Sequence, residues 1–241
     1  MTGILSAIRF FTILRVPAGD FQPRRLAACA PAAGLVIGLM LAGFDAACLR
    51  LWPVTLVSAM DVVFLAVITG ALHLDGLADT ADGLYGGRTR EKALAIMKDS
   101  RTGAMGVVAV ACCLLAKWAG IGELGVHRFL LLALIPAYSR ATVLFGMRFL
   151  PYGRSGEGTA RVFFDQPLSA WDFRWLVVVA FISLFAGRAA AALNLCFAGA
   201  TILGLWFYKK RMGCVTGDMM GAMIEFVEVA LLIAVTASVQ F

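Results

Sequence analysis

The sequence has few charged residues and few of the side chains that bind soft metals. Charged residues make up 15% of the 241 positions, whereas soluble domains usually carry roughly 25%. There are two histidines, and the six cysteines form no Cys-x-x-Cys pair, so the usual ligand pattern of a zinc site is absent. The cysteines lie mostly in apolar runs, as small packing residues do. Hydrophobic residues make up 61%, with a mean hydropathy of +0.87, which predicts an integral membrane protein.

Seven apolar runs predict an all-α, polytopic membrane helix bundle that forms one domain over residues 1–241, because about 20 helical residues cross a bilayer. The expected spans are Ala32–Leu49, Val54–Leu74, Gly103–Leu124, Phe129–Phe149, Trp175–Gly187, Ala189–Tyr208 and Ala222–Gln240. The fifth run is short, and a six-span alternative joins it to the sixth as one broken helix. Residues 1–21 carry Arg9 and Arg15 within an apolar pattern, which favours an interfacial amphipathic helix over a secretory signal.

Basic residues are distributed unevenly between the two sides of this arrangement. With seven spans, sixteen of the 21 lysines and arginines fall on the side of the N-terminus. The positive-inside rule places that side in the cytoplasm, and the expected location is a prokaryotic inner membrane. Six spans would put the cluster Lys209–Arg211 outside, so the asymmetry favours seven. The net charge of +6 thus follows membrane topology and does not indicate a nucleic-acid partner.

The most informative motif is HLDGLADTADG at residues 73–83. It places Asp75, Asp79 and Asp82 at positions i, i+4 and i+7, on one face of a helix. Like charges on one face repel, and beside hydrocarbon they also lose hydration. A cation that neutralises them is the simplest explanation, and oxygen ligands without nearby cysteine or paired histidine indicate Mg²⁺. The alternative is a solvated helix end at the membrane surface.

A second acidic segment is TGDMMGAMIEFVE. Asp218, Glu225 and Glu228 share roughly one helical face there, and the two glutamates lie inside an apolar run. Buried carboxylates of this kind indicate a metal, a proton relay or a transport pathway. The alternative is a pair neutralised within the bundle by Lys117 or Arg140.

Basic residues on the same side are candidates for holding phosphate groups. The segment of residues 88–106 alternates charged and apolar residues, which also suits an interfacial amphipathic helix. Arginine binds phosphate oxygens as a two-pronged donor and lysine as a point charge. Residues 151–165 form a glycine-containing loop typical of a mobile lid. The candidate substrate-binding residues are Arg88, Lys98, Asp99, Arg101, Arg140 and Arg154.

Several of these motifs together resemble one known family. HLDGLADTADGL, followed by REKALAIMKDSRTGAMG, resembles the signature of the cobalamin synthase family (adenosylcobinamide-GDP ribazoletransferase). TGDMMGAMIEFVE is similar to that family's C-terminal motif, and FFTILRVP is similar to its opening. The resemblance covers nearly the whole chain.

The resemblance implies a magnesium-dependent transferase. Its reaction joins alpha-ribazole, or its 5'-phosphate, to adenosylcobinamide-GDP, releases GMP and forms adenosylcobalamin or its 5'-phosphate. The expected metal ligands are Asp75, Asp79, Asp82 and Asp218. The expected proton acceptor is Glu225, Glu228 or His73. Expected partners are the two substrates, the lipid bilayer, other enzymes of cobalamin synthesis that dock on the chain, and a second copy in a homo-oligomer.

Two other functions remain open at this stage. A CDP-alcohol phosphotransferase performs parallel chemistry, but its DGxxAR pattern is not matched, because Asp82-Gly83 is followed by Leu-Tyr-Gly-Gly. An ion-coupled transporter would use intramembrane charges as a relay. No inverted repeat accompanies them, and the mid-span residue Asp61 is expected to pair with Lys117.

Overall fold

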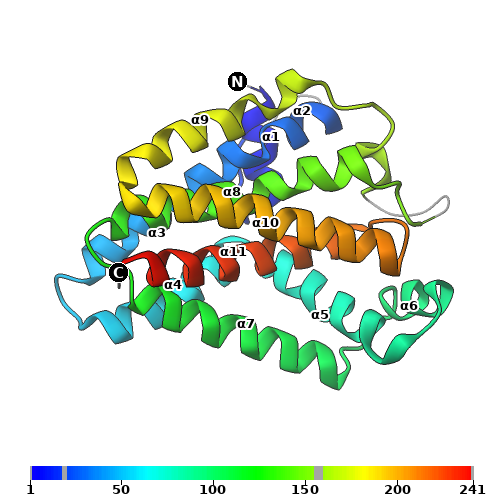
Figure 1. Cartoon of the computed structure of the whole chain (residues 1–241), viewed down its shortest axis with the longest axis horizontal. Coiled ribbons are helices and arrows are strands. Elements are labelled where there is room, and N and C mark those ends of the chain that lie inside the picture. Colours follow the sequence, from blue (N-terminus) through cyan, green and yellow to red (C-terminus); the bar gives the residue numbers. More distant parts are fainter. Residues whose placement is uncertain (1, 18–20, 155–159, 240–241) are drawn as a thin grey trace.

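The computed structural model describes residues 2–17, 21–154 and 160–239 (Figure 1). Within these residues the fold is helical, and the only extended pairing is an isolated parallel bridge between Tyr152 and Val215. Five of the described helices are long and apolar enough to cross a membrane, which confirms the all-α, polytopic bundle. They are α3 (Ala30–Cys48), α7 (Ala104–Gly122), α8 (Arg128–Phe149), α10 (Arg188–Arg211) and α11 (Gly217–Val239).

The run expected as one span over Val54–Leu74 forms two helices instead. Helix α4 (Val54–Ile68) and helix α5 (Leu72–Leu84) meet at an angle of 88°. Gly70 and Ala71 at the break both have positive φ, at 59° and 54°, and this left-handed conformation costs a residue with a Cβ about 1–2 kcal/mol. The bend turns α5, which carries the aspartates, into contact with α7 and α11.

The run Trp175–Gly187 also differs from a regular span. Helix α9 (Arg174–Ser183) has ten residues and continues as the short 3-10 turn η4 (Leu184–Ala186). Gly187, with φ 60°, then breaks the chain before α10. A Cβ on Gly187 would lie 3.7 Å from Nε2 of His127, so α9 reaches the end of the bundle where α8 begins. Five helices meet the length criterion, or six with the bent pair, and the count of seven crossings stays a prediction.

One end of the bundle gathers the basic segments, and we call it the basic end. It contains the ends of α8 and α10, the starts of α7 and α11, and helix α6 (Arg90–Ile96). Hydrogen bonds join these parts: Arg211 donates to the carbonyl of Arg88 at 2.9 Å, and Gly153 donates to the carbonyl of Val215 at 2.9 Å. The C-terminal part of α11 lies at the opposite end (Figure 1).

Small residues allow close packing of the central helices α3 and α8. A Cβ on Gly34 would lie 2.3 Å from the carbonyl oxygen of Pro136, and one on Gly38 would lie 2.2 Å from that of Ala133. Such small-residue contacts are typical of membrane helix pairs. Helix α1 (Thr2–Phe11) packs on the start of α3, and helix α2 (Pro23–Ala28) joins the two.

A buried ion cluster closes the opposite end of the bundle. Arg128 lies 2.6 Å from Asp45 and 3.3 Å from Asp61, and all three residues are buried. The expected pairing of Asp61 with Lys117 is therefore wrong. The bend between α4 and α5 leaves Asp61 facing the first residue of α8, whereas Lys117 on α7 faces α11.

Candidate active site

Helices α5 and α11 cross at glycines, and the crossing brings two acidic segments together. A Cβ on Gly76 would lie 2.7 Å from the backbone oxygen of Asp218, and one on Gly221 would lie 3.4 Å from Cα of His73. A Cβ on Gly76 would force the helices apart, whereas one on Gly221 would be in ordinary van der Waals contact with α5. Asp75 and Asp79 of α5 therefore come close to Asp218 in the first turn of α11, although more than 130 residues separate them.

The contact surrounds a cavity of about 130 Å³ at the basic end. Asp75 and Asp218 supply its carboxylates, and His73 lies deeper. The remaining walls are apolar and come from α1, α2, α8, α11 and the segment after the loop of residues 155–159. Aromatic wall residues are Phe10, Phe11 and Phe163. Phe10 and Phe11 belong to the N-terminal segment predicted as an amphipathic helix, whereas Phe163 lies in the segment of residues 151–165, which the sequence indicated as a loop.

Arg154 joins the acidic cluster from the loop after α8. Its Nη2 lies 2.6 Å from Oδ2 of Asp218 and donates to the carbonyl of Met97 at 3.1 Å. Thr216 lies at 3.4 Å from the same carboxylate. The side chains of Arg154 and Asp218 are each 24% exposed, so the pair is accessible at the mouth of the cavity. Arg154 was predicted to bind phosphate and Asp218 to bind metal, and the structure brings their side chains into contact.

Asp82 has a different environment from Asp75 and Asp79. Its two carboxylate oxygens accept hydrogen bonds from the backbone N–H groups of Gly103 at 2.6 Å and Gly106 at 2.9 Å. These N–H groups open α7, where a helix has unpaired donors and a partial positive charge. Asp82 thus ties α5 to α7. Among the described residues, no three Asp, Glu, His or Cys side chains are close enough together to form a complete metal site.

The other basic candidates surround the cluster rather than line the cavity. Arg88 donates to the carbonyl of Asp82 at 2.6 Å. Arg101 binds Asp99 through both carboxylate oxygens, at 2.6 Å for the shortest contact. These hydrogen bonds hold the pKa of Asp99 at about 2. Lys98 and Arg101 are both exposed at the basic end.

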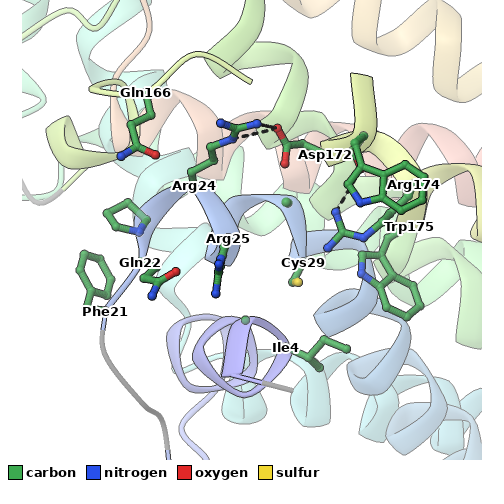
Figure 2. A pocket seen from close by; sticks show the side chains of 14 residues that line it. Ile4, Phe21, Gln22, Arg24, Arg25, Cys29, Gln166, Asp172, Arg174 and Trp175 are labelled. Atoms are coloured by element: carbon green, nitrogen blue, oxygen red, sulfur yellow. Dashed lines mark hydrogen bonds and ion pairs between the residues drawn. The ribbon is translucent and has the colours of Figure 1, made fainter. Parts of the chain in front are cut away.

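A second, larger cavity lies on the other side of α2 (Figure 2). It has a volume of about 840 Å³, and its lining includes three arginines, two tryptophans and Asp172 but none of the predicted metal ligands. The acidic cavity contacts Leu26 and Ala27 of α2, and the larger cavity contacts Arg24, Arg25 and Ala28. The two cavities are therefore separate.

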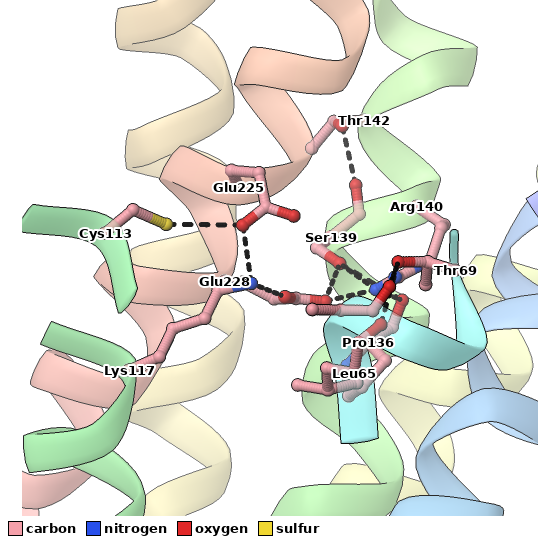
Figure 3. Close-up of polar contacts among 11 residues, drawn as sticks. Leu65, Thr69, Cys113, Lys117, Pro136, Ser139, Arg140, Thr142, Glu225 and Glu228 are labelled. Atoms are coloured by element: carbon pink, nitrogen blue, oxygen red, sulfur yellow. Dashed lines mark hydrogen bonds and ion pairs between the residues drawn. The ribbon is translucent and has the colours of Figure 1, made fainter. Parts of the chain in front are cut away.

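Glu225 and Glu228 lie deeper in the bundle, in a buried charged network (Figure 3). Lys117 Nζ lies 2.6 Å from Glu225 and 2.5 Å from Glu228. Arg140 also pairs with Glu228, which accepts a further hydrogen bond from Ser139 at 3.0 Å. This is the neutralised arrangement that the sequence left open, with both predicted cations taking part. Arg140 is 1% exposed in its side chain and does not line the acidic cavity.

His73 lies between the acidic cavity and this network. It is 3% exposed and lines the cavity. Neither ring nitrogen has a hydrogen-bond partner within the described chain, and a buried polar atom without a partner costs about 1–3 kcal/mol. The charges of Arg140, Glu228 and Lys117 act on it. A buried imidazole with both nitrogens unused is suited to proton transfer.

Comparison with known proteins identifies the family of the chain. The model of the family described as cobalamin-5-phosphate synthase matches residues 3–236. A relative from Brevibacillus brevis is 36% identical over 99% of both chains. A relative from Chlorobaculum tepidum is 35% identical over 96% of this chain and 93% of its own, and one from Mesorhizobium japonicum is 36% identical over 96% and 91%. No solved structure matches the chain.

All three relatives carry the name adenosylcobinamide-GDP ribazoletransferase, and the chain is accordingly an enzyme of the transferase class. The family match spans both acidic segments and the loop that supplies Arg154. The chain belongs to the cobalamin-5-phosphate synthase family.

Proposed function

We propose that the chain joins alpha-ribazole, or its 5'-phosphate, to adenosylcobinamide-GDP with release of GMP, and that it requires Mg²⁺. The observation that carries the proposal is the meeting of Asp75 and Asp218 at one cavity, with the carboxylate of Asp79 close to both. The relatives' names supply the two substrates. The basic loops around the cavity support a cytoplasmic orientation in a prokaryotic inner membrane.

The donor set fits magnesium. Mg²⁺ usually binds through one or two carboxylates, waters and substrate phosphates, rather than in an all-protein cage. Asp75 and Asp79 have no ion pair among the described residues, and Asp218 has one, with Arg154. We assign the metal to this cluster, with one or two of its carboxylates as ligands and with waters and substrate phosphates as the others. Asp82 is assigned instead to holding α5 against α7, because both of its oxygens accept backbone hydrogen bonds.

Bound there, Mg²⁺ would neutralise charge on the pyrophosphate and on the departing GMP. A ribose hydroxyl of ribazole attacks the phosphorus attached to cobinamide, and the bond from that phosphorus to the GMP oxygen breaks. Arg154 is placed to hold a phosphate oxygen once it releases Asp218, while Arg88, Lys98 and Arg101 hold the guanosine phosphate from the surrounding surface.

We assign proton acceptance to His73. Glu225 and Glu228 already bind Lys117 and Arg140 within 2.6 Å or less, whereas both nitrogens of His73 are unused among the described residues. The attacking hydroxyl gives its proton to His73. Glu225 and Glu228 are thus assigned to the buried charged network rather than to contact with the substrate.

The test is incubation of the purified protein with adenosylcobinamide-GDP, alpha-ribazole and Mg²⁺, with and without EDTA. We expect GMP and a new cobamide in equal amounts, and loss of both products with EDTA. CDP-diacylglycerol with an alcohol acceptor serves as the control substrate. Release of CMP from the control, without GMP from the expected substrate, would replace this function with a CDP-alcohol phosphotransferase.

A further inference from the structure

The larger cavity is bounded by α1, by α2 and by the segment that begins α9 (Figure 2). The short 3-10 turn η3 (Ala170–Phe173) leads into α9 there. Ile4 and Gly3 of α1 supply a small apolar floor. The cavity lies at the basic end, near the start of α3, and its lining contains four charged side chains: Arg24, Arg25, Asp172 and Arg174.

Two of the three arginines carry a charge without a matching carboxylate. Arg24 lies 2.9 Å from Asp172 and donates to Ser169 at 3.0 Å. Asp172 also accepts the backbone N–H of Ser169 at 2.7 Å, so that pair is complete. Arg25 forms no ion pair or hydrogen bond within the described residues, and Arg174 donates only to the carbonyl of Trp171, at 3.1 Å. The cavity therefore has an excess of positive charge.

Two tryptophans complete the lining. Trp171 is 74% exposed, and its ring lies 5.9 Å from the Arg174 guanidinium carbon. Nε1 of Trp175 is buried and faces the thiol of Cys29, a weak acceptor, with no oxygen or nitrogen acceptor among the described residues. Figure 2 shows Trp175 beside Cys29 and close to the Arg174 guanidinium. The Arg25 guanidinium, the remaining N–H groups of Arg174 and the indole N–H face the cavity with few protein acceptors among the described residues, which suits an oxyanion.

We propose that this cavity binds a phosphate ester whose remainder is apolar or flat. The guanidinium groups of Arg25 and Arg174 would hold the phosphate oxygens, and the tryptophans and Ile4 would contact the rest of the ligand. Two sources carry this chemistry: the headgroup of an anionic phospholipid, or a phosphorylated nucleoside, the second of which rests on the proposed function. Basic pockets and tryptophans at a cytoplasmic membrane face are typical of the first.

A ligand bound in the larger cavity would also affect the acidic cavity, because α1 and α2 line both. Phe10 and Phe11 of α1, with Leu26 of α2, wall the acidic cavity, while Ile4 and Arg25 of the same two helices line the larger one. A ligand that links Arg25 to Arg174 would therefore hold this N-terminal layer against α9 and keep the wall of the acidic cavity in place.

The experiment measures binding rather than turnover, so its failure is distinct from failure of the proposed function. Purified protein is titrated with phosphatidylglycerol or phosphatidylcholine of the same acyl chains, and lipid adducts are counted by native mass spectrometry. A parallel titration uses alpha-ribazole 5'-phosphate with protein in phosphatidylcholine nanodiscs. The test variants are Arg25→Gln and Arg174→Gln. The control is Arg148→Gln, a basic residue at the same end but outside the cavity.

We expect one phosphate-bearing probe to bind, with an affinity about 10-fold or more lower in each test variant, because each loses a charge-assisted hydrogen bond. Arg25→Lys should restore part of the loss, and Arg148→Gln should bind as the native chain does. Preference for phosphatidylglycerol identifies the lipid source, and binding of the nucleotide identifies the soluble source. If neither probe binds selectively, or if the test variants bind as well as the control, the proposal is wrong. The Arg25 side chain has no ion pair or hydrogen bond to lose among residues 2–17, 21–154 and 160–239, so its variant tests the site even where Arg174→Gln does not fold.

Discussion

Asp82 and Asp79 lie on the same helix but have different partners, so alanine should have different effects at the two positions. Asp82 accepts two backbone hydrogen bonds from the start of α7, at 2.6 and 2.9 Å. Asp79 has no hydrogen bond or ion pair within the described residues, and it lies within reach of the like charges of Asp75 and Asp218. Asp82→Ala should lower the free energy of unfolding, whereas Asp79→Ala should leave it unchanged or raise it.

The size of the Asp82 effect follows from its two contacts. A hydrogen bond to a charged group contributes about 1.5–3 kcal/mol, and a negative charge at a helix N-terminus adds about 0.3–1 kcal/mol. Asp82 is partly exposed, and water replaces part of what is lost. We therefore expect Asp82→Ala to destabilise the protein by about 2–4 kcal/mol. The Asp79 variant removes a partly buried carboxylate whose repulsion by Asp75 and Asp218 outweighs its attraction to Arg154, and like-charge repulsion is worth a few tenths of a kcal/mol.

Gly103 provides a matched control. The three atoms nearest to a Cβ on Gly103 all belong to Asp82, at 2.5–3.1 Å. Gly103→Ala should destabilise the native chain but cost much less when Asp82 is already alanine, so the two changes should be non-additive. Unfolding of the purified variants in detergent, followed by tryptophan fluorescence, measures all four corners of this cycle.

Two results would refute the reasoning. One is an equal loss of stability for Asp79→Ala and Asp82→Ala, which would mean that the bonds to α7 contribute nothing specific. The other is strict additivity of Asp82→Ala with Gly103→Ala, which would mean that the two groups do not meet. A third measurement separates structure from chemistry: Asp79→Ala should remain folded and lose Mg²⁺-dependent GMP release.

The remaining predictions concern the metal, the base and the buried network. Asp75→Asn should raise the Mg²⁺ concentration needed for half-maximal GMP release by at least about 10-fold, because loss of a group that merely supports a metal ligand already lowers affinity about 10–100-fold. An unchanged magnesium titration would show that Asp75 is not a ligand. His73→Gln should lower kcat by about 10²–10⁴-fold with little effect on KM, and a change confined to KM would assign it to binding. Lys117→Met leaves Glu225 buried without its cation and should cost about 3–5 kcal/mol of stability. Adding Glu225→Gln should recover much of that loss in the same unfolding assay, and no recovery would contradict the pairing.

Hydropathy and short motifs predicted much of this protein because they depend on neighbouring residues. Runs of apolar residues indicated α3, α7, α8, α10 and α11, and all five are helices of membrane-spanning length. The 3.6-residue period placed the aspartates of residues 75–82 on one helical segment, as the structure shows for α5. The same local pattern carried the family resemblance, which the family model and the relatives confirm.

The departures occur where a distant contact outweighs a local pattern. The apolar run Val54–Leu74 continues through Gly70 and Ala71, yet the chain bends there by 88° because α5 packs on α7 and α11. Asp61 has no nearby partner in sequence, and a cation 67 positions away, Arg128, binds it. The role of Asp82 was hidden for the same reason, since its hydrogen-bond donors lie 21 and 24 residues further along the chain.

The sequence by itself determined that this is a helical membrane protein, that its basic loops share one side, and that it carries two acidic segments of a particular enzyme family. Each of these depends on composition, periodicity or a continuous motif. Only the tertiary structure decided which carboxylates meet. Glycines at the crossing of α5 and α11 bring Asp75 and Asp218 to one cavity, while Lys117 and Arg140 neutralise Glu225 and Glu228 in the interior. Aspartates and glutamates with different roles cannot be distinguished in a sequence. Their roles follow from the cations, N–H groups or open space that the packed helices place beside each carboxylate.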